Sequence, residues 1–416
     1  MAVEEQVIKG RGQVLQETFA ALKYYNYRLW FSGQIVSLVG TWMQATAQGY
    51  LIYQLTNSPA YLGLVGFVGG LPAILFTLFG GVVADRLPRR TLLVITQACM
   101  LILAFVLAGL TFMNLVQPWH ILVLAFLLGV ANAFDAPART SFLLELVNRE
   151  HMTNAIALNS TMFNIATVVG PSVAGLTYAA FGPAWCFTLN GISFIAVIVA
   201  LLFMRIEPVE PPVRSGTAFA ELGEGIRYVW SQKLILSLTL AVGFVSVFGI
   251  GMLNLLPAWA KDILHGDVTT NGWLVAARGF GSLISALMLA YWGSRKMRGR
   301  MWTIGAFLMP ALLFFFAWIR WLPLSLLTLV GVGLGFMFVV NNSQAIVQSL
   351  VSDRLRGRVM GVYTLVFFGS MPLGSLLSGS LAERIGEPLA VAFGAVALLL
   401  LAVLAWIFLP EIRRQD

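Results

Sequence analysis

Charged residues are scarce in this chain. Asp, Glu, Lys and Arg make up only 11% of its 416 residues, whereas 59% of the residues are hydrophobic. A soluble domain is usually about a quarter charged and less than half apolar. The composition therefore excludes an ordinary soluble protein and indicates a chain embedded in a membrane.

Residues that build disulfides, metal sites and catalytic centres are also few. The two cysteines, Cys99 and Cys186, fall inside apolar runs without ligand spacing, and the three histidines lie near the ends of such runs. No Gly-x-x-x-x-Gly-Lys-Ser/Thr loop is present, so we do not expect ATP to drive the protein directly. We predict no enzymatic activity, no cofactor and no metal site.

The formal net charge is +8, which in a soluble protein would suggest nucleic acid. Here most basic residues lie in short loops between apolar runs, so nucleic acid is not an expected partner. The first 28 residues carry acids as well as bases and have no apolar core of the signal-peptide type. We therefore place the N-terminus in the cytoplasm.

Twelve apolar runs are each long enough to cross a bilayer as a helix, which takes about 20 residues. We predict an all-α membrane protein with twelve transmembrane helices. Most of the 26 Lys and Arg then fall on one side of the membrane, which predicts a multi-pass protein of the cytoplasmic (inner) membrane with both termini cytoplasmic. The predicted spans are 28–54, 60–84, 91–113, 119–144, 154–180, 184–204, 233–258, 271–293, 301–319, 323–348, 359–383 and 387–409.

The longest polar interruption divides the spans into six and six. Within it, apolar residues of 217–231 recur at helical spacing with charges opposite, which predicts an amphipathic helix in the cytoplasmic interface. The expected units are a cytoplasmic tail 1–27, a six-helix bundle 28–204, a linker 205–232, a second six-helix bundle 233–409 and a tail 410–416.

Glycines recur in the same register in the two halves. Gly129, Gly170, Gly175 and Gly182 align with Gly333, Gly374, Gly379 and Gly386. This indicates an internal repeat whose two copies have the same orientation. Such a repeat predicts two pseudo-symmetric bundles with a binding site at their interface.

A short charged loop joins the second and third predicted spans. It contains Gly81, Asp85, Arg86, Arg89 and Arg90, and its length forces both helix ends to the same face of the membrane. We interpret it as a tight hinge on the cytoplasmic side.

Polar residues inside spans need partners or water, so they mark candidate cavities. In the first span they form one continuous stripe at spacings of three and four residues, which favours a cavity lining over isolated interhelical hydrogen bonds. Others occur in the fourth and tenth spans. The candidate cavity residues are Gln34, Ser37, Thr41, Gln44, Gln48, Asn132, Asn341 and Asn342.

Arg278 is the only charged residue well within a predicted span. Arg278 is about a third of the way from the outer face of its span, and two interpretations are open. It either snorkels to the surface, or it serves the bundle interior by binding a polar or anionic substrate group or by holding a gate. Asp135 is the deepest acid of the chain and shares a helical face with Arg139.

These features resemble the major facilitator superfamily over essentially the whole chain. The loop resembles the family motif Gly-x-x-x-Asp-Arg-x-Gly-Arg-Arg, with Pro88 in place of the second glycine. Segment 164–182 resembles the fifth-helix motif of the family's antiporters through Gly170, Pro171 and Gly175. Segments 132–158 and 352–363 are similar to the branch that includes the enterobactin exporter and bacterial drug-efflux proteins.

The resemblance implies two six-helix bundles that rock between inward-open and outward-open states. Asp85 would lock the outward-open state by meeting the region between the fifth and eleventh helices, with Arg86, Arg89 and Arg90 tuning the lock. Asp135 matches the helix-four acid that often completes this charge relay, and Arg139 lies beside it.

We therefore expect a monomeric secondary transporter whose partners are the lipid bilayer, a small-molecule substrate and protons. It would export a hydrophobic or amphipathic molecule, drug-like or siderophore-like, by proton antiport. Asp135 would either carry the proton, with Arg139 modulating it, or only brace the gate. Two other functions stay open: a nutrient or metabolite importer or uniporter of the same fold, and a non-transporting membrane scaffold.

Overall fold

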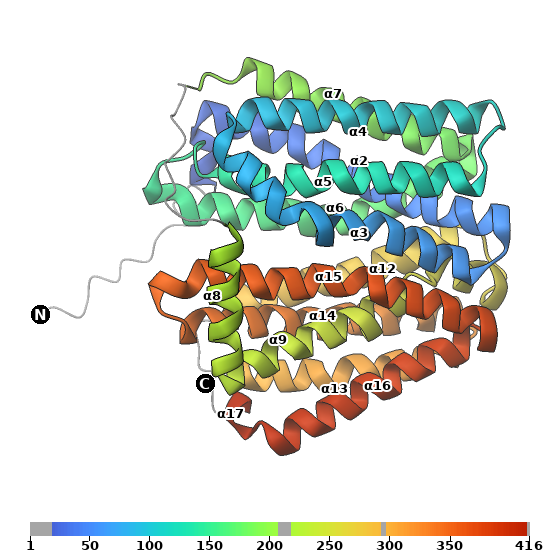
Figure 1. Cartoon of the computed structure of the whole chain (residues 1–416). Helices are drawn as coiled ribbons and strands as arrows, with labels where there is room; N and C mark the ends of the chain where they lie inside the picture. Colours follow the sequence, from blue (N-terminus) through green and yellow to red (C-terminus); the bar gives the residue numbers. More distant parts are fainter. Residues whose placement is uncertain (1–18, 207–217, 293–296, 414–416) are drawn as a thin grey trace, which may run out of the picture.

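The computed structural model describes residues 19–206, 218–292 and 297–413. Parts of the predicted tails and of the predicted linker therefore lie outside the described residues. In the residues described, every regular element is a helix, and the long helices run side by side (Figure 1).

Six long helices form the N-terminal half. The short turns η1 (Ala20–Lys23) and η2 (Arg149–His151) precede the first and the fifth of them. The six are α2 (Tyr25–Thr56), α3 (Pro59–Arg86), α4 (Arg89–Phe112), α5 (Pro118–Leu143), α6 (Met152–Phe181) and α7 (Pro183–Phe203).

The C-terminal half repeats this plan after the helix α8 (Ala218–Ser231). Its first span, Lys233–Ile263, is broken into short pieces by two π-helical turns. These pieces are α9 (Lys233–Val245), η3 (Ser246–Ile250), α10 (Gly251–Leu253), α11 (Leu256–Ala258) and η4 (Trp259–Ile263). The remaining elements are α12 (Val268–Trp292), α13 (Arg298–Phe316), α14 (Leu322–Leu350), α15 (Asp353–Ile385), α16 (Glu387–Phe408) and the short α17 (Pro410–Arg413).

Eleven helical segments of the described residues are long and apolar enough to cross a membrane. The remaining long helix, α2, has 32 residues, and its glutamines lower its mean hydropathy. The predicted all-α fold of two pseudo-symmetric six-helix bundles is therefore confirmed.

The internal repeat is visible in the backbone. Gly182 and Gly386 adopt positive φ angles of 89° and 83°, a region that is open to glycine and rare for other residues. Each glycine ends one helix and directly precedes the next, and a proline follows in the first turn of both α7 and α16. The last hinge of each half is thus built in the same way.

Helix ends follow local chemistry. Pro59, Pro118 and Pro183 each occupy the first turn of a helix, where the missing N–H costs nothing. Most helices begin earlier than the predicted spans, and for α12 and α15 the cause is visible. The Asp267 carboxylate accepts a hydrogen bond of 3.0 Å from Thr270 N and so caps α12 three residues earlier. Helix α15 begins at Asp353 because its arginine-rich first turns extend beyond the apolar run.

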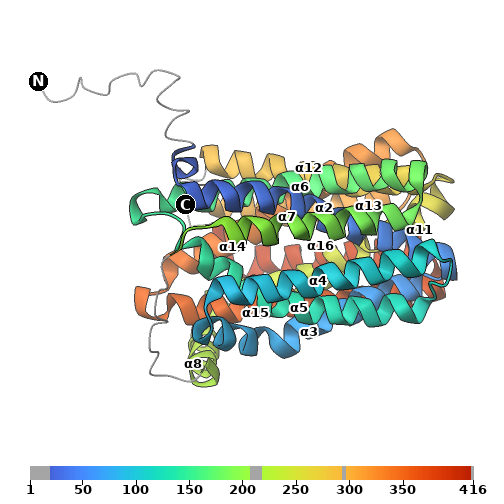
Figure 2. The ribbon, with the colours of Figure 1, turned by 90° about the horizontal axis from the view of Figure 1, so that it is seen from above.

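The two ends of the molecule are distinct. We call the end that carries η1 and α17 the termini end and the opposite one the far end. Helix α8 lies across the termini end, perpendicular to the long helices, so that Figure 2 shows it end-on. It occupies the segment for which the sequence predicts an amphipathic helix.

Candidate functional site

The two halves meet along α3 and α15, where small residues let the backbones approach closely. Toward the far end, a Cβ atom on Gly66 would lie 2.7 Å from the Ser375 side chain, and one on Gly70 would lie 2.5 Å from Pro372 Cγ. A Cβ atom on Gly379 would lie 2.7 Å from the Gly63 Cα atom. Larger side chains at these glycines are incompatible with the contact, as at other small-residue interfaces of membrane helices.

Helices α6 and α12 form a second contact between the halves. A Cβ atom on Gly272 would lie 2.5 Å from the Pro171 carbonyl oxygen, and one on Gly175 would lie 3.0 Å from Thr269 Cα. Gly170 instead packs against α2, 2.5 Å from Trp42 Cβ by the same measure. The structure thus places the antiporter-like motif where α6 contacts both its own half and the opposite half.

Polar side chains join the halves at the far end. The Tyr53 hydroxyl donates a hydrogen bond to the Asp262 carboxylate. Glu383, at the end of α15, accepts hydrogen bonds from Ser58 Oγ (2.7 Å) and Ala60 N (3.2 Å) at the start of α3. A carboxylate beside the first free N–H groups of a helix is favourable electrostatically. Lys261 Nζ also donates to Asn57 Oδ1.

The apolar core crosses between the halves at this same end. Ala258 and Val268 of the C-terminal half belong to one buried cluster with Met43, Ile52 and Ala174 of the N-terminal half. The buried cluster around Trp30 and the large cluster of the C-terminal half each draw on one half alone. We call the hydrogen bonds of Tyr53, Asn57, Ser58, Ala60, Lys261, Asp262 and Glu383, together with this shared cluster, the far-end seal.

The termini end of the α3–α15 interface is different. Gly81 lies 18 residues after Gly63, and Gly361 lies 18 residues before Gly379, so both continue the antiparallel register of that contact. A Cβ atom on Gly81 or on Gly361 would nevertheless meet nothing within 4 Å. The two helices have therefore separated by this level.

Helix α6 shows the same change along its length. Ser160 and Thr161, in its termini-end half, are exposed and donate hydrogen bonds only to carbonyl oxygens of their own helix. In its far-end half, Pro171 and Ala174 are buried. Helix α6 thus exposes polar side chains toward the termini end and buries apolar ones toward the far end.

The charged loop between α3 and α4 is anchored within the N-terminal half. Arg89 pairs with Glu145, and Arg90 Nη2 donates a 2.8 Å hydrogen bond to the Leu202 carbonyl oxygen. Arg86 is exposed. Asp85 lies in the last turn of α3, and its side chain is outside the described part of the chain.

Asp135 is buried between α4 and α5, with 1% of its surface exposed. One carboxylate oxygen accepts hydrogen bonds from Thr96 Oγ1 (2.8 Å) and Gln97 Nε2 (2.9 Å). The other lies 3.6 Å from Arg139 Nε. Asp135 therefore ties α5 to α4 inside one half, with three partners from the same half.

The polar stripe on α2 is mostly buried. Gln44 Oε1 accepts a 2.7 Å hydrogen bond from Asn190 Nδ2 of α7, and Thr41 donates to the Ser37 carbonyl oxygen. Gln34 Nε2 is buried without a partner, and Gln48 is 8% exposed. That the stripe lines a cavity stays a prediction.

The remaining candidates lie on α5, α14 and α12. Asn132 Nδ2 donates to the Leu128 carbonyl oxygen at 3.0 Å, and Asn342, fully buried, donates to the Phe338 carbonyl oxygen at 2.7 Å. Asn341 is partly exposed. Arg278 lies ten residues after the start of α12, at the middle of the span Val268–Leu289 rather than a third of the way along it.

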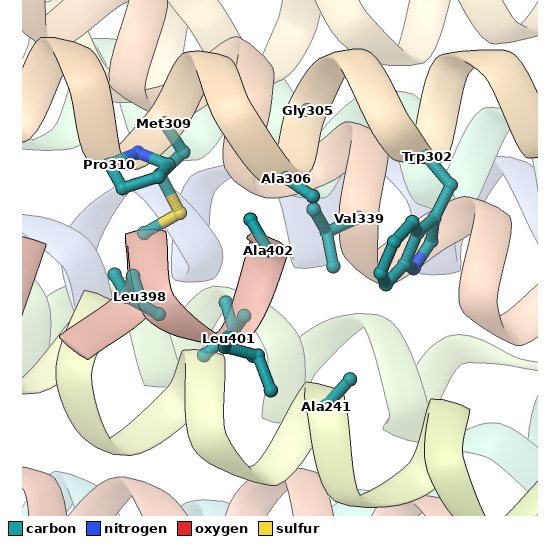
Figure 3. Close-up of a pocket in the computed structure, with 11 residues that line it drawn as sticks. Ala241, Trp302, Gly305, Ala306, Met309, Pro310, Val339, Leu398, Leu401 and Ala402 are labelled. Atoms are coloured by element: carbon teal, nitrogen blue, oxygen red, sulfur yellow. The ribbon is translucent and has the colours of Figure 1, made fainter. Parts of the chain in front are cut away.

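A small apolar pocket lies within the C-terminal half (Figure 3). It is enclosed by side chains from α9, α13, α14 and α16, and its lining contains no charged residue. Trp302, Met309 and Leu398 face it from α13 and α16. Because all of its walls belong to one half, this pocket is not the interface at which a site between the halves is expected.

The sequence alone did not reveal the far-end seal. Its acids, Asp262 and Glu383, lie at the ends of apolar runs, where charges are ordinary. The available signal was that Glu383 lies one helical turn beyond the glycine Gly379 of the repeat.

Known structures share this architecture. The chain is similar to the nucleoside transporter NupG, with a TM-score of 0.75 and 15% identity over 91% of this chain and 98% of that one. It is also similar to a bacterial homologue of the lysosomal transporter Spinster in an inward-facing, unoccupied conformation, with a TM-score of 0.69, 14% identity and coverage of 94% and 95%.

The architecture, together with a family model that matches nearly the whole chain and full-length relatives that are transporters, identifies a membrane transporter of the major facilitator superfamily rather than an enzyme. Within this class, the chain belongs to the family described as transmembrane secretion effectors, whose model matches residues 16–416.

Curated relatives cover nearly the full length. The multidrug efflux pump Tap of Mycolicibacterium fortuitum is 28% identical over 388 residues, 91% of this chain and 94% of that protein. The macrolide efflux protein A of Streptococcus pyogenes is 24% identical, with coverage of 95% and 99%. The staphyloferrin A transporter of Staphylococcus aureus is 23% identical, with coverage of 86% and 90%.

Proposed function

We propose that the protein exports hydrophobic or amphipathic small molecules across the cytoplasmic membrane by alternating access. The observation that carries this proposal is the unequal packing of the α3–α15 interface, which is closed at Gly63–Gly379 and separated at Gly81–Gly361. Export of drug-like molecules is supported by relatives named as multidrug and macrolide efflux proteins.

The charge distribution supports the orientation. Arg86, Arg89 and Arg90 lie at the termini end, as do the arginines of α15 near Arg358. Basic residues collect on the cytoplasmic side of membrane proteins. With the termini end cytoplasmic, the open packing at that end supports an inward-open state in which the far-end seal would be the outer gate.

In the opposite state, α3 and α15 would close at the termini end and the far-end seal would open. Continuing the register of the far end, Gly81 and Gly361 would then come together. Asp85, one turn beyond Gly81, would reach the termini end of α15 or α6 and lock this state, with Arg86, Arg89 and Arg90 tuning the lock.

We propose that protons drive export in exchange, with Asp135 as the coupling candidate. Its carboxylate is buried among Thr96, Gln97 and Arg139, and buried acids in membrane helices often belong to proton pathways. The same contacts suit the second role, in which Asp135 only holds α5 against α4.

The experiment that tests export and coupling together uses inverted membrane vesicles. An imposed pH gradient, acidic inside, is expected to drive uptake of ethidium by the wild-type protein. Asp135→Asn is expected to abolish the pH-driven component while ethidium binding to the purified protein persists. Thr96→Val is the matched control, because it removes one hydrogen bond and keeps the acid.

Each outcome has one meaning. Normal pH-driven uptake by Asp135→Asn would rule out Asp135 as the proton carrier. Equal losses in Asp135→Asn and Thr96→Val would assign Asp135 the bracing role. Ethidium uptake that ignores the pH gradient would indicate a uniporter. Uptake by right-side-out vesicles instead would indicate an importer of the same fold.

A further inference from the structure

A single unpaired charge lies at the centre of a membrane helix. Arg278 is ten residues from the start of α12, and at 1.5 Å per residue this places its Cα atom about 15 Å from that end of the helix. The opposite end of the span, at Leu289, is equally distant in sequence. An arginine side chain extends only about half of that distance, so snorkelling does not bring the guanidinium to either membrane surface.

No protein group neutralises this charge among the described residues. Arg278 takes part in no ion pair or side-chain hydrogen bond there, and its Nε atom is enclosed without a partner. The two acids nearest in sequence are engaged elsewhere. Asp262 binds Tyr53, and Asp267 caps α12 through Thr270. The absence of a bonded carbonyl oxygen also argues against a purely structural role.

The same face of α12 carries two more unsatisfied polar side chains. Asn271 and Ser285 stand seven residues before and after Arg278, a spacing that returns to nearly the same face of a helix. Both are fully buried, and neither the Asn271 amide nor the Ser285 hydroxyl has a hydrogen-bond partner. Buried polar groups without partners are rare in proteins, and these three give one face of α12 an unsatisfied polar character.

The neighbours of Arg278 hold its backbone in place but do not bind its guanidinium. The backbone of Arg278 packs against Gly333 of α14, and the Ser282 hydroxyl bonds the Arg278 carbonyl oxygen at 3.3 Å. The helix is thus fixed by its backbone, while the guanidinium keeps its donors free and part of the residue remains accessible. A guanidinium offers five N–H donors and no acceptor. Its complement is an anionic oxygen group, above all a carboxylate.

We infer that Arg278 binds a carboxylate of the transported molecule. This inference rests on the proposed export function and predicts that, among its substrates, amphipathic organic acids are favoured over molecules without a carboxylate. It also gives a reason for the apolar surroundings, because a charge pair is stronger where water is excluded.

Rhodamine B and its ethyl ester form a suitable probe pair, since they differ only in the free carboxylate. Transport of both dyes is measured in proteoliposomes with wild-type protein, Arg278→Gln and Arg278→Lys. The control is Arg320→Gln, which removes an arginine that stacks on Trp259 outside the α12 face. We expect Arg278→Gln to lower transport of the acid relative to the ester by about tenfold or more. Arg278→Lys should retain most of the preference, and Arg320→Gln should leave it unchanged.

An equal loss for both dyes in Arg278→Gln, or no loss, would overturn the inference. Ester transport by the variant shows that it has folded. If Arg278→Gln does not fold, binding to the wild-type protein decides, because tighter binding of the ester than of the acid also contradicts a carboxylate site. Wild-type protein that moves the ester but not the acid would leave the proposed export function standing. Failure to move either dye or ethidium would count against that function itself.

Discussion

The two ends of the α3–α15 interface use the same residue type with opposite results. At the far end, Gly63 and Gly379 are in backbone contact, whereas at the termini end Gly81 and Gly361 face open space in the same register. Glycine permits close contact but does not impose it. What distinguishes the far end is the additional set of hydrogen bonds to Asp262 and Glu383 and the apolar cluster shared by both halves.

The comparison suggests how the two states are balanced. In the proposed cycle the small residues would let both ends close, and the polar and apolar contacts around them would decide which end is closed. Two interfaces, α3–α15 and α6–α12, change together along their length. In the proposed cycle the halves would move as bodies, and a change at one end should be measurable at the other.

The largest effect is expected where a side chain is forced into the closed contact. In Gly379→Val, the new Cβ atom would lie 2.7 Å from Gly63 Cα and from the Pro59 carbonyl oxygen, and backbone atoms cannot rotate away. Overpacking of this kind costs about 1–3 kcal/mol. The far end should open, and ethidium transport should fall by about tenfold or more.

Cysteine labelling detects this shift. After Cys99, which is exposed, is replaced by Ser, a Thr269→Cys reporter marks the far end and a Ser160→Cys reporter marks the termini end. Gly379→Val should increase maleimide labelling at 269 and reduce it at 160. The matched control is Gly109→Val, because nothing lies within 4 Å of its Cβ position. Unchanged labelling in Gly379→Val would show that the far-end contact does not control the state.

The second prediction concerns substitutions that should change cysteine labelling in the opposite direction to Gly379→Val. Gly81→Leu or Gly361→Leu adds a side chain where the described structure has space, so the protein should fold normally. Closure of the termini end would be blocked at a cost of about 1–3 kcal/mol. Transport should fall several-fold, with labelling at 160 preserved or increased and labelling at 269 reduced. If these variants transport normally, Gly81 and Gly361 do not come into close contact during the transport cycle.

The positions of the helices could be predicted from the sequence because they depend on local features. Apolar length, and prolines such as Pro59 and Pro118, mark the spans within a few residues. The start of α12 was missed because the Asp267 cap lies outside the apolar run. The start of α15 was missed because hydropathy does not register charged helical turns beyond the bilayer.

The contacts of the candidate site were harder to predict because the residues that form them are distant in sequence. Glu383 caps the start of α3 from more than 300 residues away, and no local pattern shows such a partner. For the stripe on α2, the partner Asn190, which binds Gln44, cannot be identified from α2 alone. Arg278 was recognised as unusual, but its lack of a partner required the structure.

A smaller effect is expected from the polar part of the far-end seal. Glu383→Gln keeps the shape of the side chain and removes the charge that binds Ser58 Oγ and the Ala60 N–H group. Exposed hydrogen bonds of this kind contribute about 1 kcal/mol, so labelling at 269 should rise a few-fold and transport should change less than in Gly379→Val. Arg384→Gln, one residue away and also exposed, controls for a general charge effect. An effect of Arg384→Gln equal to that of Glu383→Gln would remove the capping bond from the seal.

The smallest effect is expected at the termini end, where α8 is joined to α15. Glu224 pairs with Arg358 and, at 3.7 Å, with Arg354, whose side chain is 83% exposed. Exposed ion pairs contribute about 0–1 kcal/mol. Glu224→Gln should therefore change transport less than about twofold and leave labelling at 160 and 269 nearly unchanged, as should the control Glu221→Gln. A large shift of labelling in Glu224→Gln alone would mean that α8 helps to set the conformational balance, and that the termini end has a polar gate comparable to the far-end seal.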